Sequence, residues 1–409
     1  MAIFDNIIAR VEQIQALMLL DDETIKYLLK PKRISTAEIE IEGEKILTWR
    51  ILHNEALGAG KGGIRFHPDV SEDEVKSLSF WMSLKNSLAG LPYGGAKGGA
   101  KFNPKGRSKE FLEKVSRAYV DAYYKVIGAD KDIPAPDVYT TPEIMGWMLD
   151  QYEKKVGHHE PAMITGKPIE LGGLKLRGDS TARGGFIIIK ELLHHVRNLS
   201  KQPTVAIQGF GNAGLNIAKM LYNDGFKIIA VSDSKGGVAD SKGLDIQDVI
   251  EVKTTKLSVT EYNHNALKIT NEELIEMDVD ILVLAALENQ ITSKNASKIK
   301  AKYLLELANG PVSNDADELL FKNGKTVIPD ILANSGGVIV SYFEWAQNKT
   351  GDILDEDYLE QKLFKIMESS WHKVYDLYLE KGNIDLRTSA YIIAIDRIIK
   401  AEKARGNLK

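Results

Sequence analysis

A glycine-rich hexapeptide, Gly209 to Gly214, narrows the folds open to this chain more than any other feature. It follows the apolar run Thr204–Gln208 and opens a segment with helical spacing, so the pattern predicts a strand, a tight turn and a helix. Gly209 would permit the turn, Gly211 would let the backbone approach a pyrophosphate, and Gly214 would let helix and strand pack closely. The motif predicts a doubly wound domain that binds a dinucleotide. The alternative is a βα turn without a ligand.

The next predicted strand bears on the choice of dinucleotide. It ends near Asp233, nineteen residues after Gly214, where a carboxylate can accept hydrogen bonds from the adenosine ribose. Asp233 favours NAD because it would repel a ribose 2′-phosphate, whereas Lys235 could neutralise that phosphate. The sequence therefore leaves NAD and NADP both open. The residues predicted to bind the cofactor here are Gly209, Phe210, Gly211, Asn212, Ala213, Gly214, Asp233, Ser234 and Lys235.

The chain after residue 181 alternates short apolar runs with segments of helical spacing, which is typical of a parallel sheet covered by helices. The fold class predicted is therefore α/β. Strands are expected at Thr204–Gln208, Lys227–Val231, Val279–Leu284, Tyr303–Leu307 and Thr326–Ile328. Helices are expected at Gly184–Leu199, Asp355–Lys381 and Thr388–Lys403.

The first half of the chain has another pattern. Strict alternation over residues 37–41 and an extended run over residues 46–52 predict a hairpin. Ser71, with Glu74 three residues later, and Thr141, followed by a proline, are predicted helix N-caps. Two glycine-rich segments, Gly58–Gly63 and Pro92–Gly99, are expected to form loops.

Three lysines in this half are candidates for function. Lys61 and Lys97 each lie between glycines, whose backbone can pass close to a ligand. Lys85 lies on a largely apolar helix face, where a lysine must snorkel, pair or meet an anion. Each lysine taken alone is more readily explained as a solvated residue. Together with Asp137, in a loop framed by prolines, they favour a catalytic site.

The motifs of the chain resemble those of the glutamate dehydrogenases, within the glutamate/leucine/phenylalanine/valine dehydrogenase family. The matching stretches occur in family order and span most of the chain. They are Gly60-Lys-Gly-Gly-Ile-Arg-Phe-His-Pro68, Leu91-Pro-Tyr-Gly-Gly-Ala-Lys-Gly-Gly99, Ile133-Pro-Ala-Pro-Asp137, Gly166-Lys-Pro168, Gly209–Gly214, Ala285-Ala-Leu-Glu-Asn289 and Pro329-Asp-Ile-Leu-Ala-Asn-Ser-Gly-Gly-Val338.

The resemblance implies two domains with the active site in the cleft between them. Residues 1–180 would form an α/β substrate-binding, catalytic and oligomerisation domain, which the C-terminal helix, residues 385–409, rejoins. Residues 181–384 would form a Rossmann NAD(P)-binding domain. The implied reaction is reversible oxidative deamination of an amino acid, with ammonium and a 2-oxo acid as products.

The resemblance also assigns roles to single residues. Lys97 would be the catalytic lysine, and Asp137 would carry the proton to and from the substrate nitrogen. Lys85 would pair with the α-carboxylate of the substrate. Thr181 would contact the nicotinamide amide, and the cofactor and substrate would be lined by Asn309 and Asn334. The Ala285-Ala286 turn is expected beside the cofactor.

Two positions favour glutamate as the substrate, with 2-oxoglutarate and ammonium as its products. Family members acting on glutamate place a lysine and a serine against the γ-carboxylate, and Lys61 and Ser341 occupy those positions. An apolar substrate would leave the Lys61 ammonium buried and unpaired. A dehydrogenase of leucine or phenylalanine is the alternative within the family.

Composition argues against other classes of protein. The net charge of −4 and the scattered basic residues disfavour nucleic-acid binding. No run is long and apolar enough for a membrane helix, and the absence of cysteine fits a cytoplasmic protein. The adjacent pairs His158–His159 and His194–His195 diverge on a helix, so no metal site is expected. A homo-oligomer, commonly a hexamer, is implied by the resemblance.

Two further hypotheses remain open. The chain could be a dinucleotide-binding regulator without activity, but such a protein would be expected to lack Lys97 or Asp137. Alternatively, the lysine-rich loops could bind a phosphorylated metabolite, and an assay of glutamate against phosphosugars would distinguish that reading.

Overall fold

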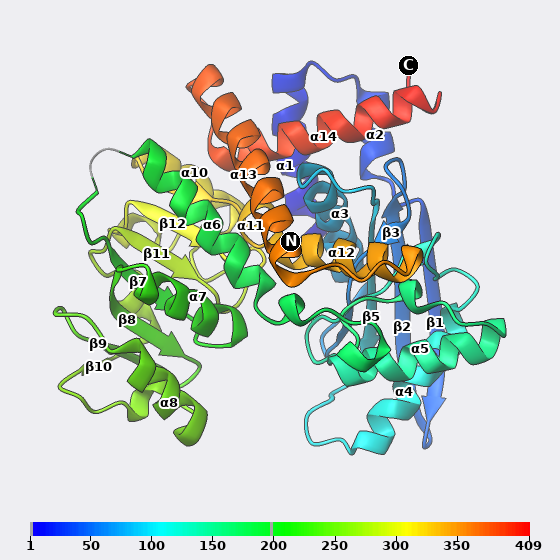
Figure 1. The fold of residues 1–409 in the computed structure, drawn as a ribbon. Helices are drawn as coiled ribbons and strands as arrows, with labels where there is room; N and C mark the ends of the chain where they lie inside the picture. The colour runs from blue at the N-terminus through cyan, green and yellow to red at the C-terminus, as the bar shows by residue number, and fades with distance from the viewer. Residues whose placement is uncertain (1–2, 197–198) are drawn as a thin grey trace. The chain divides into compact units, whose positions relative to one another are not determined.

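A computed structural model describes residues 3–196 and 199–409, which form two compact units (Figure 1). Unit 1 comprises Met1–Arg177, Val338–Gln361 and Tyr391–Lys409. Unit 2 comprises Gly178–Gly337 and Lys362–Ala390.

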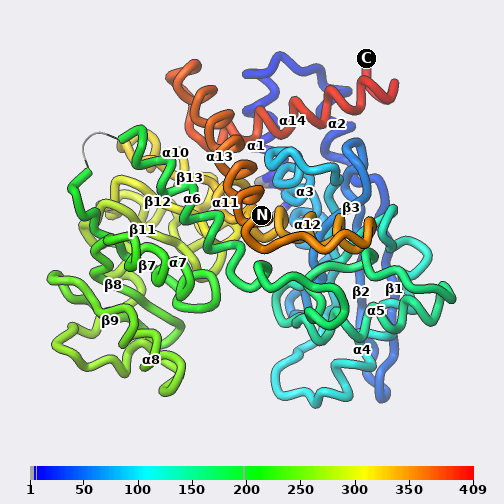
Figure 2. The backbone as a smooth tube through the Cα atoms, in the orientation of Figure 1, coloured from blue at the N-terminus to red at the C-terminus, as the bar shows by residue number. Residues whose placement is uncertain are grey.

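The units differ in three places from the domains expected from the sequence. Residues 178–180, expected in the first domain, belong to unit 2. Residues 338–361, which the sequence reading assigns to the 181–384 domain, belong to unit 1. Of the expected C-terminal return, residues 391–409 belong to unit 1 and residues 385–390 to unit 2. The path of the chain through these returns can be followed in Figure 2.

Unit 1 is built on a four-stranded sheet with the order β1-β2-β5-β4. Its strands are β1 (Arg33–Ile41), β2 (Glu44–Asn54), β4 (Ile64–Phe66) and β5 (Gly95–Lys101). The β1–β2 and β2–β5 pairs are antiparallel, and the β4–β5 pair is parallel. A separate short parallel pair joins β3 (Gly60–Lys61) to β6 (Asp132–Ile133).

The helices of unit 1 cover this sheet (Figure 1). The pair α4 and α5 packs with β1 around a large apolar core, and α3 packs against β2 and β5. The predicted N-caps Ser71 and Thr141 are confirmed, each accepting a hydrogen bond from a backbone N–H three residues on. The helices are α1 (Ile3–Met18), α2 (Asp22–Leu29), α3 (Glu72–Leu88), α4 (Lys109–Tyr123), α5 (Pro142–Val156), α12 (Gly336–Thr350) and α14 (Leu386–Ala404), with 3-10 turns at Pro161–Met163, Ile169–Leu171 and Lys175–Gly178.

The prediction of a loop over Pro92–Gly99 is wrong for most of its length, because Gly95–Lys101 is strand β5 at the centre of the sheet. The glycines are required by packing. A Cβ on Gly95 would lie 2.2 Å from the backbone nitrogen of Ser83 on α3, and one on Gly98 would lie 2.3 Å from the Tyr119 hydroxyl. At these two positions the neighbouring helices lie too close for any side chain, so only glycine fits. Likewise, Gly60 and Lys61 of the other expected loop form strand β3.

Unit 2 contains a seven-stranded sheet with the order β10-β9-β8-β7-β11-β12-β13. The five strands from β8 to β13 are parallel, which confirms the α/β fold class and the doubly wound sheet. The antiparallel edge formed by β9 and β10 was not predicted. The strands are β7 (Thr204–Gln208), β8 (Lys227–Asp233), β9 (Gly236–Ala239), β10 (Leu267–Ile269), β11 (Ile281–Leu284), β12 (Tyr303–Glu306) and β13 (Thr326–Ile328).

Helices flank this second sheet, with α6 packed against α7 (Figure 1). The helix expected at 184–199 begins earlier, at Ser180, and is α6 to His195; residues 197 and 198 of that prediction lie outside the described residues. The remaining helices are α7 (Asn212–Asn223), α8 (Ile246–Lys256), α9 (Asn271–Ile275), α10 (Asn314–Lys322), α11 (Asp330–Ala333) and α13 (Glu356–Lys381), with 3-10 turns at Val259–Glu261 and Ala296–Lys298. Among all described residues, no helix combines the length and apolar character needed to cross a bilayer.

Candidate active site

Lys97 and Asp137 form a buried ion pair in unit 1. Lys97 lies on β5, opposite Ile51 of β2, and a bridge between Ile64 and Pro136 places the Asp137 loop beside β4. The Lys97 ammonium contacts Oδ2 of Asp137, and both side chains are nearly covered, with 7% and 13% exposed. The sheet therefore brings together the two residues predicted to be catalytic.

Neighbouring groups fix the Asp137 side of this pair. The Asp137 backbone N–H donates to Thr140 Oγ1 (2.7 Å), and that hydroxyl donates to the Ile64 carbonyl (2.8 Å). Asp137 Oδ1 accepts from the Val138 N–H (2.8 Å) and lies 3.7 Å from a terminal nitrogen of Arg65. The carboxylate thus has one defined orientation toward β5.

Both pKa values of the pair are lowered, for different reasons. Burial lowers the pKa of Lys97; the Asp137 carboxylate opposes this effect, and Arg65 adds to it. Burial alone would raise the pKa of Asp137, but Lys97 and Arg65 outweigh it and hold that pKa at about 2. The site therefore holds a firmly ionised carboxylate against an ammonium that releases its proton more readily than a solvated lysine does. Perturbed pKa values in a buried pair of this kind are typical of functional sites.

Lys61 is a second buried cation of unit 1. It is 1% exposed on β3, and the one hydrogen bond that the described residues give its ammonium is a long one, 3.4 Å to the Pro134 carbonyl. Burial lowers its pKa far below the usual value, and the neighbouring Arg177 and Arg50 lower it further. A buried ammonium with so weak a partner is suited to receive an anion.

Ser341 and Arg177 extend the site around Lys61. Ser341, 2% exposed on α12, accepts a 3.1 Å hydrogen bond from Arg177 Nε. Because Arg177 also acts electrostatically on Lys61, the structure links both residues predicted to recognise the substrate side chain. Lys85 is 8% exposed on α3, one turn after Met82, whose Cγ lies 3.4 Å from where a Cβ on Gly62 would be.

Four polar residues of this region were missed by the sequence reading: Arg65, Thr140, Arg177 and Glu344. Glu344 is fully buried and accepts from Lys167 Nζ (2.8 Å) and from the Gly166 N–H (2.8 Å). Arg65 lies inside a stretch that carries the family resemblance, so that stretch held a usable signal. The local sequence gives no sign that Arg177 or Glu344 has a role, because their partners lie far away along the chain.

The Gly209–Gly214 turn of unit 2 is shaped by close backbone contacts. Gly209 has φ +90°, and a Cβ there would lie 2.6 Å from the Ala285 carbonyl carbon. A Cβ on Gly214 would lie 1.8 Å from the Gly209 oxygen, whereas one on Gly211 would meet no described atom within 4 Å. Gly209 and Gly214 are therefore required by packing, while Gly211 leaves open space at the surface of the turn.

This open space lies at the start of α7. The N-cap of α7 is Gly211, which has no side chain to bond the first N–H groups of the helix. Strand β7 pairs with β8 on one side and with β11 on the other, so the turn after it lies at the point where the strand order reverses. Free amides at such a position fit a pyrophosphate. The residues present therefore fit the dinucleotide expected from the sequence.

The remaining residues of the motif differ in exposure. Phe210 is 1% exposed, so only its backbone could contact a bound dinucleotide. Asn212 is exposed and donates 2.8 Å to the Gly178 carbonyl, and Ala213 is half-buried. Ala285 donates its N–H to the Gln208 carbonyl (2.8 Å), which holds the half-buried Ala285-Ala286 turn against Gly209.

Asp233 ends β8 as predicted, but its own chain surrounds its carboxylate. Oδ1 accepts from the Lys235 N–H (2.9 Å) and the Ser258 hydroxyl (3.3 Å). Oδ2 accepts from Lys253 Nζ and the Val259 N–H, at 2.8 and 2.9 Å. These contacts use the four acceptor positions of a carboxylate. Against its burial, they lower the pKa of Asp233. Ser234 and Lys235 are exposed.

Three further residues predicted to line the cofactor lie in unit 2. Asn334 is 7% exposed and donates to Asn309 Oδ1 (3.0 Å), so the structure brings these two residues together. Its own Oδ1 is buried with no described hydrogen-bond partner. Thr181 is half-buried in the first turn of α6, whose N-cap, Asp179, makes no side-chain cap bond.

Comparison with known proteins agrees with these features. Residues 172–406 match the family model described as glutamate/leucine/phenylalanine/valine dehydrogenase, and residues 31–154 match the dimerisation domain of the same family. The structure resembles a hetero-hexameric glutamate dehydrogenase from Thermus thermophilus, in a leucine-bound form, with a TM-score of 0.91 and 30% identity over 99% of this chain and 97% of that one. It also resembles the glutamate dehydrogenase of Peptoniphilus asaccharolyticus, with a TM-score of 0.86 and 34% identity over 99% and 100% of the two chains.

Curated relatives match nearly the full length. A glutamate dehydrogenase from Thermotoga maritima is 43% identical over 99% of this chain and 98% of its own. An NADP-specific glutamate dehydrogenase from Saccharolobus shibatae is 43% identical over 99% and 97%. A cryptic catabolic NAD-specific glutamate dehydrogenase from Bacillus subtilis is 42% identical over 94% and 91%. With both its domain models and its full-length relatives in agreement, the chain belongs to the glutamate/leucine/phenylalanine/valine dehydrogenase family.

Proposed function

We propose that this chain catalyses the reversible oxidative deamination of L-glutamate to 2-oxoglutarate and ammonium, with NAD⁺ or NADP⁺ as the hydride acceptor. The observation that carries the proposal is the buried Lys97–Asp137 pair in the same unit as the buried Lys61 ammonium. The full-length relatives named glutamate dehydrogenase support it, and they include both an NADP-specific and an NAD-specific enzyme.

Lys97 and Asp137 divide the proton chemistry between them. The nicotinamide, when bound, supplies the acceptor for the hydride that leaves C2 of glutamate. Asp137 takes the proton that the substrate nitrogen loses, and later returns one to the departing ammonia. Lys97 activates the water that attacks the C2 imine and stabilises the developing charge on the C2 oxygen. The pKa of Asp137, about 2, keeps its carboxylate ionised across the neutral range.

The remaining cations of unit 1 would bind the two carboxylates of the substrate. Lys61 would pair with the γ-carboxylate, with Ser341 and Arg177 beside it. Such a charge-assisted hydrogen bond contributes roughly 1.5–3 kcal/mol. Lys85 would pair with the α-carboxylate. An amino acid with an apolar side chain would bury Lys61 without an anion, which disfavours leucine and phenylalanine as substrates.

In unit 2, the residues after β7 would hold the dinucleotide. The amides at the start of α7 would bind the pyrophosphate, and Gly211 would leave room for it. The residues at Asp233, Ser234 and Lys235 would face the adenosine ribose. Thr181, Asn309 and Asn334 would orient the nicotinamide, together with the Ala285-Ala286 turn.

We also propose that the chain assembles as a homohexamer in the cytoplasm. The support for the hexamer is the similar Thermus thermophilus structure, which is described as hetero-hexameric. Sedimentation of the purified chain would test the number of subunits, and cell fractionation would test the location.

The experiment that tests the proposed function is an initial-rate assay by absorbance of the reduced cofactor. Glutamate, leucine and phenylalanine would each be offered with NAD⁺ and with NADP⁺. Lys97→Ala is expected to lower kcat by roughly 10²–10⁴-fold, because it removes a general acid–base group. Lys61→Leu is expected to reduce kcat/KM for glutamate far more than for leucine.

Lys101→Ala provides the matched control, because Lys101 lies on the same strand as Lys97 but is exposed. It should leave the rates unchanged. If no amino acid reduces either cofactor, the proposal fails, and the hypothesis of a dinucleotide-binding regulator without activity is favoured instead. Wild-type activity on leucine alone would instead move the chain to another branch of the family.

A further inference from the structure

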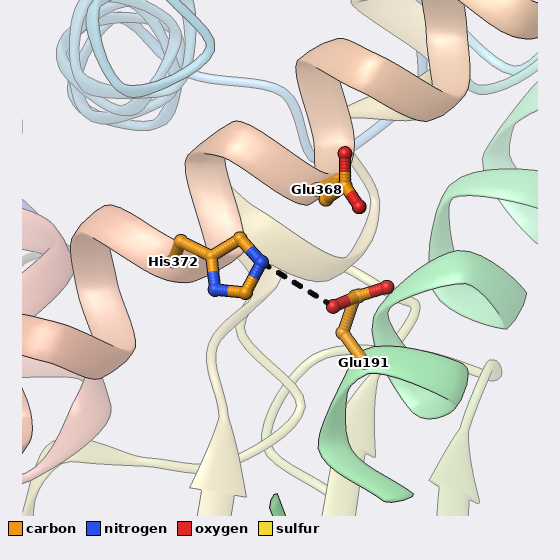
Figure 3. A group of neighbouring side chains, drawn as sticks. All are labelled: Glu191, Glu368 and His372. Atoms are coloured by element: carbon orange, nitrogen blue, oxygen red, sulfur yellow. Dashed lines mark ion pairs between the residues drawn. The ribbon is translucent and has the colours of Figure 1, made fainter. Parts of the chain in front are cut away.

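Glu191, Glu368 and His372 form a cluster in unit 2 that the proposed reaction does not use. Glu191 lies on α6, and Glu368 and His372 lie one turn apart on α13. Figure 3 shows the three side chains turned toward one another from these two helices. Glu191 is ten residues after Thr181, and a helix rises about 1.5 Å per residue, so the cluster is roughly 15 Å along α6 from that residue.

The distances in this cluster are compatible with ligands of one metal ion. One ligand atom from each residue lies within 4.8 Å of the other two. His372 Nε2 is 3.6 Å from Glu191 Oε2, and His194 Nδ1 is 3.7 Å from Glu191 Oε1. Both separations exceed a hydrogen bond, which spans about 2.7–3.2 Å. They are close to the roughly 3.4 Å that separates ligand atoms around a tetrahedral zinc ion with bonds of about 2.0–2.1 Å.

The burial of Glu191 independently favours a bound cation. Its side chain is only 4% exposed, yet among the described residues neither carboxylate oxygen has a hydrogen-bond donor within reach. The groups beside it are the two imidazoles at 3.6 and 3.7 Å. A buried carboxylate without hydrogen bonds is costly unless a cation neutralises it. Glu368, half-buried across from it, adds a second negative charge.

We propose that Glu191, Glu368 and His372 bind one Zn²⁺ ion, with water completing its coordination. Carboxylate and imidazole together form the ligand set of zinc, whereas magnesium and calcium prefer oxygen ligands alone. The two carboxylates balance the charge of the dication. The ion would clamp the C-terminal half of α6 to α13, two helices of one unit that are far apart in the sequence. This role does not depend on the proposed dehydrogenase activity.

The test uses the full-length chain, stripped with a chelator and dialysed, then titrated with ZnCl₂ by calorimetry. Wild type is expected to bind one ion per chain and to show a higher unfolding temperature with zinc. Cobalt would replace zinc as a probe, since its visible spectrum reports whether the site is four-coordinate. His372→Ala and Glu368→Gln should each weaken zinc binding by roughly tenfold or more, since even the loss of an outer partner typically costs 10–100-fold.

His264→Ala is the matched control, because His264 is an exposed histidine of the same unit and stacks on Tyr262. It should bind zinc as wild type does. The proposal is overturned if wild type binds no stoichiometric ion, or if both ligand variants bind as tightly as wild type. Should His372→Ala unfold without zinc, Glu368→Gln alone decides, since it removes a ligand charge and keeps the side-chain shape.

Discussion

Two buried lysines of unit 1 differ in what neutralises them. Lys167 donates 2.8 Å to Glu344, and neither side chain is exposed. Among the described residues, Lys61 has a single weak bond to a backbone carbonyl, 3.4 Å long. Burial lowers the pKa of both lysines; Glu344 opposes that shift at Lys167 through a direct ion pair, and Glu344 and Asp132 oppose it at Lys61 without one. The first lysine therefore has a structural partner, whereas the second suits the ligand role proposed above.

The same substitution at both positions should separate these roles. Lys167→Met is expected to destabilise the fold by about 3–5 kcal/mol, because it leaves Glu344 buried without its cation. Lys61→Met removes a poorly paired buried ammonium, so stability should be unchanged or higher. Urea denaturation of the two variants and wild type is the measurement. Equal losses of stability would show that Lys61 is also structural.

Lys253 is expected to govern the choice between the two cofactors. It donates 2.8 Å to Asp233 and so masks the charge that would repel a 2′-phosphate. Lys253→Met should expose that charge, and the ratio of kcat/KM for NADP⁺ to that for NAD⁺ should fall by about tenfold or more, equivalent to roughly 1.4 kcal/mol. Glutamate KM measured at saturating cofactor is the control. A ratio that stays constant would exclude Asp233 from cofactor selection.

At the scale of elements, the parallel strands of unit 2 and the capped helices of unit 1 are predictable from the sequence. Apolar runs of strand length, bounded by turn residues, identify β7, β8, β11, β12 and β13. Strand β5 is not predictable in this way. Its glycines are required by close contacts with α3 and Tyr119, and the local sequence pattern carries no information about these contacts. Helix α12 begins at two glycines, and no helix was predicted over its residues.

The candidate site divides along similar lines. Lys61, Lys97, Asp137 and Ser341 carry the family resemblance and could be named from the sequence. Arg177 and Glu344 could not, because each acts through contacts with residues more than 160 positions away. Three of the four bonds on Asp233 were also hidden, since Lys253, Ser258 and Val259 reach it from later parts of the chain.

Substitution of Gly211 tests the proposed pyrophosphate site at the N-terminus of α7. Its backbone has φ −86° and a Cβ would meet no described atom within 4 Å, so Gly211→Ala should fold, with only the small loss of stability expected for alanine at an N-cap. The methyl group would occupy the space proposed for the pyrophosphate, and NAD(P)H affinity should fall by at least tenfold by fluorescence titration. Gly214→Ala is the contrast: its Cβ would lie 1.8 Å from the Gly209 oxygen, so the fold itself should suffer. Undiminished affinity in Gly211→Ala would place the phosphates elsewhere.

At the scale of the whole molecule, Arg387 lies among three buried carboxylates in unit 2. It donates 2.7 Å to Glu306 and 2.7 Å to Asp317, and lies 3.5 Å from Asp330. One cation among three acids leaves an excess of negative charge. Burial, with Asp330 and Asp317 adding to it and Arg387 opposing, raises the pKa of Glu306 to about 7.

This shift predicts how stability depends on pH. A raised pKa means that the folded state holds the proton more tightly, so its contribution is full below pH 4.5 and is lost as pH rises through about 7. The change amounts to roughly 3 kcal/mol at most. Glu306→Gln cannot titrate, so its free energy of unfolding should fall less between pH 5 and pH 8 than that of wild type. Denaturation at several pH values checks this, and parallel curves for the two proteins would contradict it.

The chain crosses between the units four times, and this has a consequence for biosynthesis. Unit 1 draws on residues 338–361 and 391–409 as well as on the N-terminal segment. The Trp81 indole, for example, donates 2.9 Å to the Tyr391 hydroxyl, 310 positions later. On a ribosome that adds about 5–20 residues per second, the first strands must therefore wait tens of seconds for their last partners. All residues of unit 2 are synthesised by residue 390, whereas unit 1 also needs residues 391–409. The unit whose first strands are made earliest is therefore completed last. A nascent chain stalled before residue 391 would leave unit 1 incomplete and accessible to proteases and chaperones.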